Sequence, residues 1–210
     1  SEPNLVENDT IIIHCPLPGE LLTSIEITPI GGTSDYSIST DGGSLFENYG
    51  TYTLDLNTGQ SYDIVIRDIN DCISPVYPIT IDETLIIDAI TFNECYGIGQ
   101  TDEVVNVSIS GGSSDYYLST DGGLNFGPQG IYSEAIPINA NYSVVVMDAK
   151  GCLSEATAIQ LPNVFSSSIS ASSNYNGFDI SCFGLNDGEA TVLAFGGSES
   201  YSYLWNNGQT

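Results

Sequence analysis

The sequence predicts an all-β fold made of tandem modules, and two observations carry this prediction. Residues 31–43 return as residues 111–123 with ten of thirteen residues identical, at an offset of 80. Such a fixed period is the signature of a repeat protein. Each copy also consists of short runs in which apolar and polar residues alternate, in a chain with thirteen tyrosines and no long helical pattern. We therefore expect β-sheets, in units small enough to fold around one thin core each.

The repeat marks where the modules begin and end, because the offset of 80 residues holds without a gap across the first two copies. We expect a first module at residues 1–82, a second at residues 83–164 and the N-terminal part of a third at residues 165–210. This third copy stops in mid-module, so the natural chain is expected to continue beyond Thr210. The serine-rich residues 166–173 are predicted to form its first strand.

The first half of a module is predicted to contain three strands. In the first module, the opening strand covers residues 10–14. In the next strand Ile25 and Ile27 alternate with polar residues, which is the period of two expected when one face of a sheet is buried. A third strand carries Ile38 inward and ends at residues 41–43, whose Asp-Gly and Gly-Gly steps suit a tight hairpin turn.

The second half is predicted to add three more strands. These run through residues 52–56, through residues 62–66, and through a final stretch containing Pro78, which cannot donate a ladder hydrogen bond and so belongs at a sheet edge. Tyr62 and Tyr142 open the fifth strand at the position of the tyrosine corner of immunoglobulin-like sandwiches. Six such strands predict an immunoglobulin-like or PKD-like β-sandwich in each module. The short joints between modules predict an elongated rod.

The chain is strongly acidic. It has 27 acidic side chains against two basic ones, Arg67 and Lys150, and a net charge of -25. Binding to nucleic acid needs clustered basic residues, as does docking on anionic membranes, so neither partner is expected. No run approaches the roughly 18 apolar residues that predict a membrane span. The surplus carboxylates keep a secreted chain soluble and also attract divalent cations.

Four of the five cysteines occupy equivalent positions in the first two modules, as in a disulfide framework. If the chain simply reverses at every turn of a six-stranded module, the turn after the first strand and the turn before the last lie at the same end. We therefore predict bridges within modules, Cys15 with Cys72 and Cys95 with Cys152. Cys182 is expected to be unpaired, because its partner would lie beyond the end of the sequence. Such bridges indicate an oxidising, extracellular setting.

Four aspartates stand at repeated turns. Asp41 and Asp121 belong to the pattern SxDxGxxF, which resembles the Asp-box hairpin of sialidase-type propellers, where it is a structural turn. Asp68 and Asp148 stand four residues before a cysteine, where a carboxylate most often closes an Asx turn. We predict that all four cap backbone donors. The alternative is that they bind calcium, whose ligands are carboxylate oxygens; no other cofactor is expected.

Nothing in the sequence predicts an enzyme. His14 is the single histidine and has no repeated counterpart, which argues against a His-based catalytic triad. Carboxylates for glycoside hydrolysis are abundant, but no spacing singles out a pair. Tyr201, Tyr203 and Trp205 alternate as core residues do; the alternative is an exposed platform on which sugars stack.

The third copy carries motifs that resemble a known family. The run CFGLNDGEATV from Cys182, the double glycine at Gly196 and the run YSYLWNNG from Tyr201 are similar to the opening half of the SprB repeat. The closing DxxGC of that family is matched by residues 148–152 and, with an aspartate in place of the glycine, by residues 68–72. The resemblance implies a long filamentous adhesin of gliding Bacteroidetes, exported by the type IX secretion route to the cell surface and used in gliding and attachment.

Two hypotheses about function follow. The first is a non-enzymatic stalk segment of a surface adhesin, whose partners are neighbouring repeats of the same long chain, with surface polysaccharide as a further candidate. The second is a calcium-dependent carbohydrate-binding module, suggested by the repeated Asp-rich turns and the tyrosines. A glycosidase is a distant third.

Overall fold

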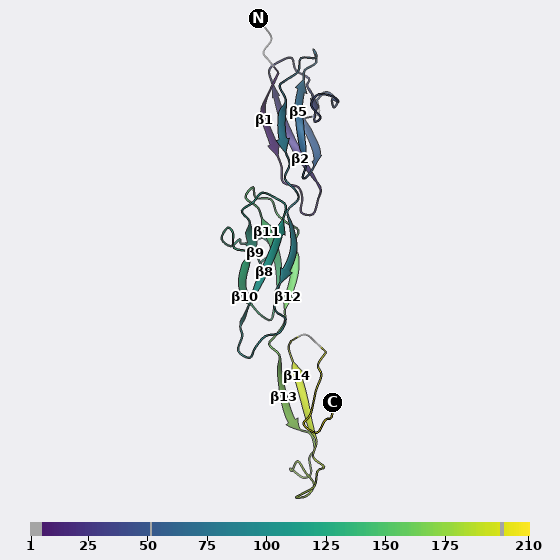
Figure 1. Cartoon of the computed structure of the whole chain (residues 1–210), viewed down its shortest axis with the longest axis vertical. Helices are drawn as coiled ribbons and strands as arrows, with labels where there is room; N and C mark the ends of the chain where they lie inside the picture. The colour runs from purple at the N-terminus through teal and green to yellow at the C-terminus, as the bar shows by residue number, and fades with distance from the viewer. Residues whose placement is uncertain (1–5, 51, 198–199) are drawn as a thin grey trace. The chain divides into compact units, whose positions relative to one another are not determined.

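The computed structural model describes residues 6–50, 52–197 and 200–210 (Figure 1). The first five residues of the expected first module therefore lie outside the described part. All regular elements within it are strands, which confirms the all-β prediction. Their bounds are β1 (Glu7–Ile13), β2 (Leu22–Ile30), β3 (Ser37–Ser39), β4 (Thr53–Asn57), β5 (Ser61–Arg67), β6 (Tyr77–Thr80), β7 (Ile86–Thr91), β8 (Asp102–Ser110), β9 (Tyr117–Ser119), β10 (Ser133–Pro137), β11 (Ala140–Met147), β12 (Thr157–Leu161), β13 (Ser166–Ala171) and β14 (Ala190–Phe195). No helix in this part of the chain is long and apolar enough to cross a membrane.

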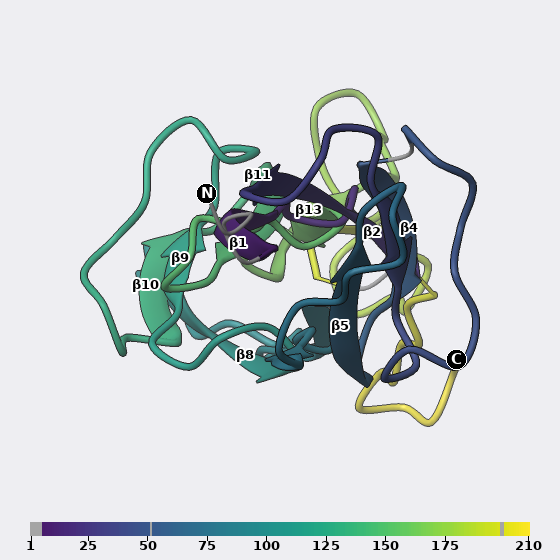
Figure 2. The same ribbon diagram turned by 90° about the horizontal axis from the view of Figure 1, so that it is seen from above.

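The first six strands form two antiparallel sheets of three strands each, in the orders β1-β2-β4 and β3-β5-β6. Figure 2 shows β4 beside β2 in the first of these sheets. The next six strands repeat the arrangement as β7-β8-β10 and β9-β11-β12. Two sheets of three strands confirm the six-stranded sandwich predicted for a module. The strand β6, which contains Pro78, lies at a sheet edge as predicted.

The core of the first module is built from both of its sheets. On β2 the side chains of Ile25 and Ile27 are buried while Glu26 between them is exposed, so the predicted alternation is confirmed. Full burial of one such aliphatic side chain stabilises a fold by roughly 2 kcal/mol. The buried cluster consists of Val6, Ile25, Ile27, Ile38, Leu56, Ile64, Ile66 and Ile81.

The second module buries the same positions with smaller residues. Val105 and Val107 on β8 stand where the first module has isoleucines, and so do Val144 and Val146 on β11; all four valines are buried. Because valine and isoleucine are both β-branched and apolar, the pleated surface keeps its packing face. The pattern of burial is therefore the repeated feature, and the identity of each residue is secondary.

The directions of the strands place two connections at opposite ends of the first module. β3 is antiparallel to β5, and β4 is antiparallel to β2. The tight turn from β4 to β5 reverses the chain, so β3 and β4 run in the same direction. The chain must then cross the module between them, and the described residues of this segment, 40–50 and 52, form no strand. The Gly50 N–H donates to the Tyr36 carbonyl oxygen at 2.9 Å. The β1–β2 turn and the β5–β6 turn therefore lie at opposite ends.

Contacts divide the chain into two compact units. One comprises Ser1–Ala89, Val107–Tyr132 and Ser143–Thr157, and the other comprises Ile90–Asn106, Ser133–Tyr142 and Ala158–Thr210. The second unit includes the third, partial copy, in which β13 pairs with β14 in antiparallel register from Ser166 with Phe195 to Ala171 with Ala190. The strand predicted in residues 166–173 is therefore confirmed.

Candidate functional site

The turn after β3 is held by the carboxylate of Asp41. Its Oδ1 accepts hydrogen bonds from the Ser39 hydroxyl at 2.6 Å and from the backbone N–H groups of Ser44 and Leu45, each at 2.9 Å. The Ser39 Oγ in turn accepts the N–H of Gly43 at 2.9 Å. The bond from Ser39 and those from the backbone stabilise the charged carboxylate, so the pKa of Asp41 lies below its usual value. Asp41 is thus the cap that the sequence predicted.

The equivalent turn in the second module has one additional bond. Asp121 Oδ1 accepts the Ser119 hydroxyl at 2.8 Å and the backbone N–H of Asn125 at 2.9 Å, while Asn125 Nδ2 donates to Oδ2 at 2.6 Å. The Asn125 side chain is the main reason that the pKa of Asp121 falls to about 2. In the first module Leu45 stands at this position and offers no side-chain donor.

Asp68 joins two turns of the first module. Its carboxylate is buried, with Oδ1 accepting the N–H groups of Asn70 and Cys72, both at 2.9 Å, and Oδ2 accepting the N–H of Thr33 at 3.0 Å. Burial raises the pKa of Asp68, but the bonds from these three amides outweigh it, and the pKa is lowered. The carboxylate thereby ties the β5–β6 turn to the turn after β2.

Asp148 makes the same set of bonds in the second module. Its Oδ1 accepts the N–H groups of Lys150 and Cys152 at 2.9 and 2.8 Å, and its Oδ2 accepts the N–H of Ser113 at 2.9 Å. The cap interpretation thus holds for all four predicted aspartates, which lie in four separate turns. In the described residues no group of three or more His, Cys, Asp or Glu side chains could hold a metal ion. Calcium at the four aspartates stays a hypothesis.

The double glycine of the second module packs against the backbone of residues 83–84, which lead into β7. The Gly112 N–H donates to the Glu83 carbonyl oxygen at 2.8 Å. A Cβ on Gly111, which has a φ of 72°, would lie 1.9 Å from the Thr84 carbonyl oxygen, so a side chain is excluded there. Sequence reasoning assigned these glycines only to strand breaks. Their return in all three copies was the signal of this further role.

Tyrosine hydroxyls close two turns in each module. Tyr62 and Tyr142 donate to backbone carbonyl oxygens five residues upstream, at 3.4 and 2.7 Å, which confirms the predicted tyrosine corner. A second set was not predicted. Tyr116 and Tyr201 each donate at 2.7 Å to the carbonyl oxygen of the first glycine in their double glycine, so the same tyrosine follows the same turn in the second and third copies.

The cysteines pair differently from the prediction. The structure joins Cys15 to Cys152, which are 137 positions apart, and leaves Cys72, Cys95 and Cys182 free and exposed. The predicted bridges of Cys15 with Cys72 and of Cys95 with Cys152 are therefore not the ones in the structure. The physical reason is the crossing between β3 and β4, whose described residues form no strand. It makes the chain traverse the module once more than a count of strands suggests, so Cys15 and Cys72 lie at opposite ends.

The Cys15–Cys152 bond lies at the joint between the first two modules, residues 81–85. Beside it Lys150 forms an ion pair with Asp82, and the Thr84 hydroxyl donates to the Glu20 carbonyl oxygen at 2.7 Å. A cavity of about 250 Å³ at this joint is lined by both apolar and charged side chains. One of the two basic residues of the chain is therefore paired with an acidic residue at this joint.

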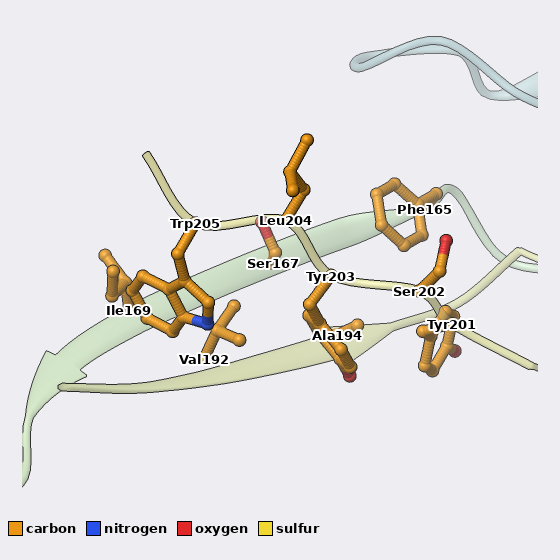
Figure 3. Close-up of a pocket in the computed structure, with 10 residues that line it drawn as sticks. All are labelled: Phe165, Ser167, Ile169, Val192, Ala194, Tyr201, Ser202, Tyr203, Leu204 and Trp205. Carbon is orange, nitrogen blue, oxygen red and sulfur yellow. The ribbon is translucent and has the colours of Figure 1, made fainter. Parts of the chain in front are cut away.

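The third copy contains a groove lined by aromatic side chains (Figure 3). Its volume is about 300 Å³. The ring centroids of Phe165 and Tyr201 lie 5.7 Å apart at its rim. Tyr203 is 38% exposed, and Trp205 is half-buried. The lining residues are Phe165, Ser167, Ile169, Val192, Ala194, Tyr201, Ser202, Tyr203, Leu204 and Trp205. The alternating aromatic residues thus pack over β13 and β14, yet keep part of their ring surface open.

Comparison with protein families confirms the resemblance in the third copy. A family model described as the SprB repeat matches residues 178–210. This range contains the Cys182 run, the double glycine and the Tyr201 run on which the resemblance rests. No curated protein sequence matches the chain.

Comparison with solved structures bears on the fold. The C-terminal 282-residue fragment of intimin, solved in complex with the intimin-binding domain of the translocated intimin receptor, is 15% identical over 82% of this chain and 67% of that chain, with a TM-score of 0.51. The fibronectin(III)-like modules of Clostridium thermocellum CbhA are 18% identical over 71% of this chain and 91% of that chain, with a TM-score of 0.37. Three N-terminal domains of the Hoc protein of bacteriophage RB49 are 20% identical over 81% and 61%, with a TM-score of 0.35. The likeness to the intimin fragment supports the predicted immunoglobulin-like sandwich fold, and nothing about function follows from it.

Proposed function

We propose that this chain is a non-enzymatic repeat segment of a secreted cell-surface adhesin, used in gliding motility and surface attachment. The observation that carries the proposal is the SprB repeat match at residues 178–210. The same module architecture recurs through the chain, as a stalk of repeated modules requires. Each repeated carboxylate and tyrosine that the sequence singled out is used for turn structure, which leaves no repeated catalytic set.

The proposed organisation is a long array in which each module contacts its neighbours in sequence. Residues 1–82 and 83–164 are two such modules, and residues 165–210 begin a third. We place the array outside the cell, exported by the type IX route, where its net charge of -25 would keep neighbouring filaments apart. Its partners are the adjoining repeats and, through other parts of the adhesin, surface polysaccharide.

The test uses the cells that make the protein. Fab fragments raised against the purified chain are expected to label intact cells and to reduce the fraction of cells that attach to glass and glide. A strain lacking the segment should show the same deficit without Fab. Fab fragments against a cytoplasmic protein are the matched control. Labelling only after lysis would contradict surface location, and normal gliding and attachment of the deletion strain would contradict the role.

Carbohydrate binding is the second candidate function, and the groove of Figure 3 favours it. Aromatic faces such as those of Tyr203 and Trp205 are the surfaces on which sugar rings stack. A glycan array with the purified chain, with and without calcium, separates the two candidates, and a stalk segment is expected to bind nothing in either condition. Binding that Trp205→Ala removes and Leu193→Ala leaves would establish the second candidate instead, since Leu193 on β14 is exposed and does not line the groove.

Chelation decides whether calcium has a part in either function. When the concentration of free calcium is a hundred times the dissociation constant of the site, binding adds about 2.7 kcal/mol to the stability of the folded state. If the four aspartates act only as turn caps, a chelator should leave the Tm of the chain unchanged. A fall of several degrees that added calcium reverses would establish a calcium site.

A further inference from the structure

Three cysteines have no disulfide partner within the described residues, and their positions follow the repeat. Cys15, Cys95 and Cys182 each follow the first strand of their module, whereas Cys72 and Cys152 each lie in the turn before the last strand. The structure bonds one member of each set, Cys15 to Cys152. Every free cysteine therefore has a bonded counterpart at the equivalent place in another module.

The two sets stand at opposite ends of a module. The chain leaves the first module at the end that carries Cys15, where the Gly59 N–H donates to the Asp82 carbonyl oxygen at 3.1 Å. It enters the second module at the end that carries Cys152, where the Gly112 N–H donates to Glu83. An exit cysteine of one module thus meets the entrance cysteine of the next.

The second joint repeats the backbone geometry of the first. The Asn139 N–H donates to the Pro162 carbonyl oxygen at 3.2 Å, as Gly59 does to Asp82 at the first joint. The Gly197 N–H donates to the Asn163 carbonyl oxygen at 2.8 Å, the same length as the bond from the double glycine at the first joint. Because Cys95 stands at this second exit as Cys15 stands at the first, and is exposed, it is placed for the same bond.

We propose that every joint of the array is closed by a disulfide between the exit cysteine of one module and the entrance cysteine of the next. Cys95 pairs with the entrance cysteine of a complete module that follows, and Cys72 pairs with the exit cysteine of a module that precedes. In each case the partner is another module of this repeat. The inference rests on the repeated joint and not on adhesion or gliding.

Formation of such a bridge is an oxidation with a simple balance. Two cysteine thiols lose two protons and two electrons as their sulfur atoms form one S–S bond. A small disulfide such as glutathione disulfide accepts the electrons and protons and is cleaved to two thiols. Exposed thiols are accessible to an oxidant of this class, and Cys72, Cys95 and Cys182 are all exposed.

The test keeps the full chain and inserts a second copy of residues 85–164 after Val164, so that a complete module follows Cys95. The protein is equilibrated in a glutathione redox buffer, labelled with a maleimide after denaturation, and mapped by mass spectrometry without reduction. The proposal predicts a peptide that links Cys95 to the Cys152 of the inserted copy, in addition to the original link. It predicts three labelled thiols per molecule, the number of free cysteines in the unmodified chain. An unbridged insertion would carry two more labels and would overturn the proposal.

The matched control carries Cys152→Ser in the inserted copy alone. Cys95 should then be labelled while the bridge to Cys15 remains, which also reports that the first joint is intact. A second measurement needs no insertion. In the chain without the insertion, Cys152→Ser should leave Cys15 labelled and unpaired. A link from Cys15 to Cys72 in any of these proteins, or a link from Cys95 to Cys152 in the natural chain, would show that bridges form within modules.

Discussion

The first and second modules end their fifth strand in turns of different sequence and the same shape. The first has Asp68-Ile-Asn-Asp71-Cys72, and the second has Asp148-Ala-Lys-Gly151-Cys152. The residue before the cysteine has positive φ in both, 63° at Asp71 and 86° at Gly151. Because the buried aspartate accepts two amides of its own turn in each module, the carboxylate sets the turn and the glycine only eases it.

The same two turns differ in what their cysteines do. Cys72 is free, whereas Cys152 is bonded to a residue of the preceding module. The local shape of a turn therefore says little about its disulfide. Whether the cysteine of such a turn is bonded depends on which cysteine of a neighbouring module lies next to it.

The largest expected difference concerns the two cysteines. Cys152→Ser removes a cross-link between positions 137 apart, which on the chain-entropy model contributes up to about 5 kcal/mol to the free energy of unfolding. Cys72→Ser removes no bond and should change stability by less than about 0.5 kcal/mol. Denaturant unfolding with and without reductant measures both. Reductant should destabilise the natural chain and the Cys72→Ser variant, but not Cys152→Ser, and equal effects of the two substitutions would contradict the observed pairing.

Much of the fold follows from patterns within a few residues of sequence. The alternation around Ile25 predicted β2, and Pro78 predicted an edge strand, because each depends on burial or bonding along a single strand. The caps at Asp41 and Asp68 were predictable for the same reason, since an Asx turn is closed by residues two to four positions away.

The cysteine pairing depends on the direction in which the chain runs through the module, and no local sequence pattern predicts that direction. Residues 40–52 lack alternation and contain Gly42, Gly43 and Gly50, so they indicate a loop. A loop that crosses a module carries the chain to its other end, as a strand would, so the next strand starts from that end. Likewise, the role of Gly111 depends on the approach of Thr84, a segment that the fold brings there and sequence spacing does not.

A smaller effect is expected where the two turns differ at the residue before the cysteine. A non-glycine residue at positive φ is less favourable than glycine, although aspartate tolerates it better than most. The left-handed conformation costs a non-glycine residue roughly 1 to 2 kcal/mol, and glycine adds unfolded-state entropy worth roughly 0.4 to 1 kcal/mol. Asp71→Gly should therefore stabilise the first module by about 0.5 to 1 kcal/mol, and Gly151→Asp should destabilise the second by a similar amount.

The exposed contact of Asp71 with Arg67, at 3.6 Å, is worth little, and Asp71→Asn serves as the control that removes this charge without freeing the backbone. Denaturant midpoints of the four proteins test the pair. A loss of stability in Asp71→Gly that Asp71→Asn shares would mean that the ion pair, and not the backbone, dominates at this turn.

The smallest expected effect lies in the hairpins after β3 and β9. Asp121 receives the side-chain amide of Asn125, whereas Asp41 has Leu45 at that place. Asn125→Leu should therefore raise the pKa of Asp121 from about 2 toward that of Asp41, and Leu45→Asn should lower the pKa of Asp41 further.

A carboxyl whose folded pKa lies below its ordinary value of 3.8 stabilises the folded state fully above pH 3.8, and this contribution disappears as the pH falls through the folded pKa. The hairpin of Asn125→Leu should thus lose its stabilisation at higher pH than the natural hairpin, over the range between pH 4 and 2. NMR titration of the two carboxyl carbons measures both shifts, and an unchanged Asp121 titration in Asn125→Leu would show that the backbone amides and Ser119 alone account for the low pKa.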